Sequence, residues 1–192
     1  MSQLQLIVGL GNPGGQYEAT RHNAGFWLLD AIADRYSGRF SSESKFKGEV
    51  CKVSVGGQNL WLLKPATFMN RSGDAVRALK EFYKIDLSDI LVVHDELDLQ
   101  PGTARIKKGG GHGGHNGLRS IIANCGGADF FRLRIGIGHP GDRSQVSNFV
   151  LHKPSQEEFR LIEESIDASI DVFSLMLSGD MAKAMNQLHS KK

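Results

Sequence analysis

Hydrophobic residues follow two periods along this chain, and together they predict strands that alternate with helices. Short, mostly apolar runs are typical of buried strands. They occur at about 4–10, 48–55, 59–64, 90–93, 103–107 and 132–138. Gly56-Gly57 separates two of these runs and favours a tight hairpin turn between them.

The helical spacing of three and four residues appears between and after these runs. It predicts helices at about 22–36, 75–83, 118–122, 156–178 and 180–189. The fourth has the clearest pattern, with one apolar stripe that extends from Phe159 to Leu177. Ser155 and Glu158 form a capping-box pattern at its start, and Gly179 suits its end.

This order of elements favours an α/β fold. We expect a twisted mixed sheet, mostly parallel, that is flanked by helices on both faces. The length of 192 residues suits one domain, which we expect to cover residues 1–192.

Four predicted strands each end in a polar segment. These segments are Gly11–Gly14, Lys64-Pro65 (which leads to Asn70), His94–Glu96 and His139–Gly141. In open α/β sheets, ligands bind outside the carboxyl ends of the strands. If the strands are mostly parallel, their polar ends share one edge, and we expect the functional site there.

Composition adds one unusual feature, which is 23 glycines clustered in turns. The net charge of +2 neither requires nor excludes a nucleic-acid partner. The apolar runs are far shorter than the ~20 residues that span a bilayer, and none resembles a signal peptide, so we expect no membrane partner. Cys51 and Cys125 stand apart, which favours free thiols and a cytoplasmic location.

Two sequence motifs suggest a cofactor, one a dinucleotide and the other a metal ion. Gly9–Gly14 matches the dinucleotide pattern G-x-G-x-x-G, but Pro13 removes one N–H, and residues 15–21 separate the turn from the predicted helix. His94–Asp98 and the pair His112 and His115 offer metal ligands, but neither has the H-E-x-x-H spacing. We expect no metal and no cofactor.

His22 and Asp95 are candidates for acid–base chemistry. A carboxylate that accepts a hydrogen bond from one imidazole nitrogen fixes the tautomer and leaves the other nitrogen free as a base. His22 lies at a helix start and Asp95 at a strand end. Their pairing is a hypothesis, and the alternative is that His22 is a surface residue or bonds only to the helix start.

The segment 107–117 combines lysines, glycines and histidines. Its glycines let backbone N–H groups approach an anion, and Lys107 and Lys108 add positive charge. With Arg105, Arg132 and Arg134 it is a candidate phosphate-binding patch. The competing interpretation is a flexible linker beside a solvated strand.

Five segments carry the most specific pattern. They are Gly9–Gly14 with Tyr17 and Thr20–Asn23, Lys64–Gly73, His94–Asp98, Gly109–Gly117 and Arg132–Pro140. In composition, order and spacing they resemble the bacterial-type peptidyl-tRNA hydrolase family. Arg71 in a variable position and Cys125-Gly126-Gly127 in place of a more usual loop are small departures.

The resemblance implies hydrolysis of the ester that links a peptide to the terminal ribose of tRNA. It implies that His22 activates or orients water, that Asp95 holds His22, and that Asn12 positions water or the peptide carbonyl. Asn70 and Asn116 would supply amide groups to the substrate. The remaining implied contacts are Lys107 and Arg134 with the tRNA 5′ phosphate, and Tyr17, Met69, His115 and the region of Val150-Leu151 with the peptide or the 3′ end.

Peptidyl-tRNA is therefore the expected partner, bound by its acceptor end and 5′ phosphate, and a monomer is the expected state. Two other hypotheses remain open. One is a non-catalytic RNA-binding module, which the presence of both His22 and Asp95 disfavours. The other is a metal-dependent hydrolase that uses His112 and His115.

Overall fold

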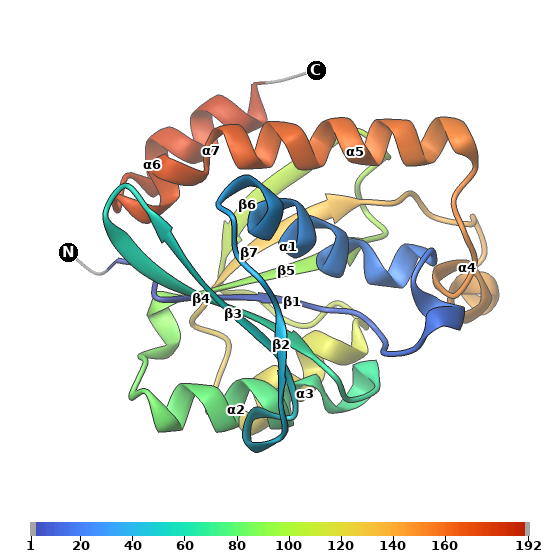
Figure 1. The fold of residues 1–192 in the computed structure, drawn as a ribbon. Coiled ribbons are helices and arrows are strands. Elements are labelled where there is room, and N and C mark those ends of the chain that lie inside the picture. Colours follow the sequence, from blue (N-terminus) through green and yellow to red (C-terminus); the bar gives the residue numbers. More distant parts are fainter. Residues whose placement is uncertain (1–2, 191–192) are drawn as a thin grey trace.

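The computed structural model describes residues 3–190, so residues 1–2 and 191–192 of the predicted domain lie outside the described part. Its centre is one seven-stranded sheet (Figure 1). The strands, in chain order, are β1 (Leu6–Gly9), β2 (Ser41–Glu43), β3 (Gly48–Val55), β4 (Gln58–Pro65), β5 (Ile90–Glu96), β6 (Ala104–Lys108) and β7 (Phe131–Gly136).

The sheet order is β2-β3-β4-β1-β5-β7-β6. The central strands β4, β1, β5 and β7 are mutually parallel, whereas β2, β3 and β6 run antiparallel to their neighbours. The predicted mixed sheet with a parallel centre is confirmed. The carboxyl ends of the four parallel strands meet at one edge of the sheet.

Helices cover both faces of the sheet, as predicted (Figure 1). On one face lie α1 (Ala24–Arg35), α5 (Gln156–Asp171), α6 (Phe173–Leu177) and α7 (Met181–His189), and on the other lie α2 (Ser72–Phe82) and α3 (Asn116–Asn124). The short α4 (Val146–Val150) lies near the edge where the parallel strands end. Among the described residues, no helix is both long and apolar enough to span a bilayer.

The sheet separates two hydrophobic cores. Successive side chains of a strand point to opposite faces, so Ile7 packs with α1 and α5, whereas Leu6 and Val8 pack with α2 and α3. Burial on both faces explains why β1 and most of β5 are continuous apolar runs. Each fully buried Leu or Ile side chain stabilises the fold by about 1.5–3 kcal/mol.

Two glycines set how closely α1 approaches the sheet. A Cβ atom on Gly9 would lie 2.5 Å from the carbonyl oxygen of Gly25, and one on Gly25 would lie 2.5 Å from that of Val93. Larger residues would therefore push the start of α1 away from β1 and β5. Since His22 immediately precedes α1 and Asp95 lies on β5, these glycines control the distance between them.

Several predicted boundaries are wrong for physical reasons. His94, Asp95 and Glu96 belong to β5 and do not form a turn after it, because β7 continues to pair with the strand. The long C-terminal helix is interrupted at Val172 and divides into α5 and α6. Both helices bury their apolar residues in the same core, so the hydrophobic period could not reveal the break.

Candidate active site

A cleft of about 220 Å³ lies beside the carboxyl end of β5. Its walls come from β5, β6, β7, residues 111–115, the start of α3, α4 and the turn that holds His22. Six of the predicted site residues lie in its lining: His22, Asp95, Lys107, His115, Asn116 and Arg134. The structure therefore brings these six residues together around one cleft.

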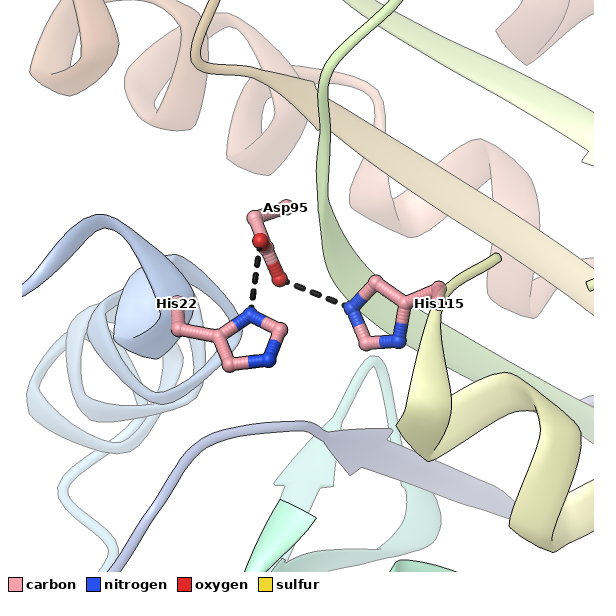
Figure 2. Close-up of side chains that lie close together, drawn as sticks. All are labelled: His22, Asp95 and His115. Atoms are coloured by element: carbon pink, nitrogen blue, oxygen red, sulfur yellow. Dashed lines mark hydrogen bonds and ion pairs between the residues drawn. The ribbon is translucent and has the colours of Figure 1, made fainter. Parts of the chain in front are cut away.

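Asp95 lies between two imidazole rings (Figure 2). His22 Nδ1 is 2.8 Å from Asp95 Oδ2, and His115 Nε2 is 2.8 Å from Asp95 Oδ1. Burial raises the pKa of Asp95, but the electrostatic attraction of the two imidazoles and their hydrogen bonds outweigh it and hold the pKa below its usual range. Asp95 is therefore ionised and only accepts hydrogen bonds.

This acceptor determines the tautomer of His22. The proton lies on Nδ1, which donates to Asp95, so the lone pair of the neutral ring is on Nε2. Burial lowers the pKa of His22, but the charge and hydrogen bond of Asp95 outweigh it, and the pKa is raised from 6.5. The basic form of His22 is therefore lost as the pH falls through this raised pKa.

His115 has the opposite tautomer. Its Nδ1 accepts hydrogen bonds from the backbone N–H groups of Gly117 at 3.1 Å and Leu118 at 3.4 Å, so it caps the first turn of α3. The ring proton must lie on Nε2, and it is donated to Asp95.

His94 also contacts this group but cannot exchange protons near neutral pH. Burial first, and then the neighbouring His115, lower the pKa of His94 to about 3, so its ring is neutral. Its Nδ1 donates to the carbonyl oxygen of Asp95 at 2.8 Å, and the ring lies edge-on to His115. His94 therefore borders the cleft as a buried, neutral ring.

Arg21 holds the turn that carries His22. This buried side chain donates to the carbonyl oxygens of Phe149 at 2.9 Å and His152 at 3.4 Å. It also forms an ion pair with Glu158 at 3.3 Å and lies over the Phe149 ring. These contacts fasten His22 to α4 and α5.

Arg132 plays a similar part for the glycine-rich segment. Its guanidinium donates to the carbonyl oxygen of Gly111 at 2.5 Å and also to that of Gly110. From the sequence alone, Arg132 is a candidate for a phosphate-binding patch, and Arg21 has no expected role of its own. The structure shows both as supports, and no local pattern reveals this because their partners are distant in sequence.

Lys107 and Arg134 lie in the same cleft. Lys107 is exposed, and it pairs in register with Arg132 across β6 and β7. Arg134 is partly buried and lies 3.8 Å from Glu96, measured between Nη1 and Oε1. The two cations can therefore approach one anionic group that enters the cleft.

Four predicted site residues lie outside the lining of this cleft. Asn12 is buried, and its Oδ1 accepts from the backbone N–H of Met69 at 2.7 Å, which joins the turn after β1 to the segment after β4. Met69 is buried, whereas Asn70 is exposed beside it. Tyr17 lies edge-on to Phe68 at a centroid distance of 6.3 Å.

One group could offer three ligands to a metal ion. Within residues 3–190, only His22, Asp95 and His115 bring such atoms within 4.8 Å of one another. The metal sets considered from the sequence, namely His94–Asp98 and the pair of His112 and His115, are not assembled in this part of the chain.

Several known proteins match nearly the whole of this chain. The family model for peptidyl-tRNA hydrolase matches residues 6–192. The peptidyl-tRNA hydrolase of Ruthia magnifica is 53% identical over 189 residues, covering 98% of this chain and 99% of the relative. That of Pectobacterium atrosepticum is 54% identical over 193 residues, covering 100% and 99%.

A solved structure shows the same fold. The crystal structure of peptidyl-tRNA hydrolase from Acinetobacter baumannii has a TM-score of 0.97 and 47% sequence identity, and the match covers 100% of this chain and 97% of that one. The resemblance seen in the five sequence segments is thereby confirmed. This chain belongs to the peptidyl-tRNA hydrolase family and is an enzyme of that activity.

Proposed function

We propose that the enzyme hydrolyses the ester between an N-blocked aminoacyl or peptidyl group and tRNA, with water activated by His22 and Asp95 and without a metal ion. The observation that carries this proposal is the 2.8 Å hydrogen bond from His22 Nδ1 to the buried carboxylate of Asp95. It leaves Nε2 as the proton acceptor.

In the first step, His22 Nε2 accepts a proton from water as the water oxygen attacks the ester carbonyl carbon. The tetrahedral intermediate then expels the ribose oxygen, which takes the proton from the imidazolium of His22. The products are a free peptide carboxyl group and a terminal hydroxyl on the tRNA. Asp95 stabilises the transient imidazolium without leaving its position.

Amide groups complete the proposal. Asn116 Oδ1 accepts from Arg119 at 3.3 Å, so its Nδ2 is oriented as a donor for a developing oxyanion or a substrate carbonyl. The family resemblance assigns the same role to Asn70, which is exposed next to Met69. Asn12 would act through its hold on the Met69 segment, and Tyr17 and Met69 would border the path of the peptide or the 3′ end.

The tautomer of His115 supports a metal-independent reaction. A metal ion would need the lone pair of His115 Nε2, but that nitrogen carries the ring proton because Nδ1 accepts from Gly117 and Leu118. Binding a metal would therefore cost the cap of α3 as well as both hydrogen bonds to Asp95.

We further propose that the enzyme acts as a monomer in the cytoplasm, where ribosomes produce peptidyl-tRNA. Lys107 and Arg134 would bind the 5′-terminal phosphate of the tRNA. Two cations in one cleft can recognise a phosphate without a strongly basic surface, which is compatible with the net charge of +2.

The substrate proposal is tested with N-acetylated and free aminoacyl-tRNA. We expect rapid release of the acetylated aminoacyl group and slow release of the free one. Enzyme that has been treated with EDTA and separated from the chelator should be equally active. Equal turnover of the two substrates would contradict the substrate assignment, and lost activity that zinc restores would contradict metal independence.

The phosphate proposal is tested by Lys107→Ala. We expect weaker tRNA binding and a slope of log Kd against log salt that is smaller by about 1, because one phosphate contact is lost. The matched control is Lys108→Ala, since Lys108 lies next to it on β6 but pairs with Asp129 at 3.8 Å outside the cleft. A slope that both variants leave unchanged would rule out the contact.

A further inference from the structure

We propose that His115 is a positioning residue that holds the Asp95 carboxylate in place for His22. Its contact with Asp95 is as short as that of His22, at 2.8 Å, and each imidazole uses a different carboxylate oxygen. This role differs from a contact with the peptide or the 3′ end of tRNA. It rests on the proposed function of His22 as the base.

The position of His115 is itself determined by α3. The His115 ring accepts from the first N–H groups of this helix, and the backbone N–H of His115 donates to the carbonyl oxygen of His112 at 2.9 Å. The helix is fastened to α2, because the N–H of Gly73 donates to Ser120 Oγ at 2.8 Å. Because α2 and α3 are fastened together, His115 holds Asp95 in a fixed position relative to both helices.

Two donors restrain the carboxylate more than one donor does. Rotation of the Asp95 carboxyl group about its Cβ–Cγ bond would break both hydrogen bonds at once (Figure 2). The second donor also draws negative charge toward Oδ1. His115 therefore keeps Oδ2 directed at His22. It also weakens the electrostatic attraction between Asp95 and the Nδ1 proton of His22.

Two amide variants of His115 separate its two contacts. In His115→Asn, Oδ1 can take the place of Nδ1 as the helix cap, since asparagine is a favourable N-cap residue, but the side chain is too short to reach Asp95. In His115→Gln, the longer amide can donate to Asp95 but loses the cap. The asparagine variant thus removes the proposed function and retains the structural one, whereas the glutamine variant does the reverse.

The first measurement is the titration of His22 followed by NMR, which requires no turnover. We expect the pKa of His22 to rise in His115→Asn, because Asp95 then has His22 as its single side-chain donor, and to stay near the wild-type value in His115→Gln. The second measurement is kcat against pH. In His115→Asn, kcat should fall by about 10- to 100-fold with little change in KM, and its acid limb should move to higher pH.

The outcomes are distinct. A His22 titration that is unchanged in His115→Asn overturns the positioning role, as does a glutamine variant that is as slow as the asparagine variant despite correct folding. If the titration moves in His115→Asn but kcat does not, the positioning role stands and His22 as the base is wrong. A lower Tm in His115→Gln alone is expected from the lost cap.

Discussion

Replacing His22 with alanine should lower kcat by about 10²- to 10⁴-fold, which is the usual contribution of a general base. The affinity for tRNA should not change, because the proposed phosphate contacts come from Lys107 on β6 and Arg134 on β7. The measurement is single-turnover hydrolysis of N-acetylaminoacyl-tRNA beside a binding assay with deacylated tRNA. Slow hydrolysis with unchanged tRNA binding would identify His22 as part of the chemical step.

The control for this experiment is His152→Ala. The His152 side chain is exposed, and Arg21 contacts only its backbone carbonyl, which alanine retains. We expect this variant to have wild-type turnover. Substantial hydrolysis by His22→Ala would show that another group activates water and would end the proposed mechanism.

The change Asp95→Asn should cost about as much as loss of His22, that is about 10²- to 10⁴-fold in kcat. Both imidazoles donate to the carboxylate, but an asparagine side chain has one acceptor oxygen and one donor nitrogen. One of the two histidines must then face an N–H group. If that residue is His22, its proton moves to Nε2, and the base is lost.

The test combines kcat with the acid limb of the pH profile. Because Asp95 is what raises the pKa of His22, any residual activity of Asp95→Asn should persist to lower pH than that of the wild type. Asp98→Asn is the matched control, since it removes the same charge from an exposed carboxylate of the same cleft. Equal losses in both variants would assign the effect to charge alone.

Much of the fold follows from local patterns. The apolar runs and helical stripes placed nearly all strands and helices. The clearest strands are β1 and most of β5, which are continuously apolar because both of their faces are buried. Short elements with few apolar residues were missed, such as β2 with the sequence Ser41–Glu43 and α4. Their formation depends on neighbouring segments and not on their own propensity.

Only part of the candidate site, likewise, could be predicted from the sequence. The motif resemblance singled out His22 and Asp95, and the structure places them in hydrogen-bond contact at 2.8 Å. The contact of His115 with Asp95 could not be predicted, because the ring reaches Asp95 only after α3 has packed on the sheet. The same holds for Arg21, whose partners Phe149 and Glu158 are more than a hundred residues away in sequence.

By itself, then, the sequence determined the α/β class with a mostly parallel central sheet and the family. These properties depend on period, turn chemistry and motif order, which are local. Tertiary structure alone decided which residues touch Asp95 and which tautomer each histidine takes. A hydrogen bond depends on distances of a few tenths of an ångström, and here those distances follow from the close contact of Gly9 with Gly25 and from the packing of α3 against α2.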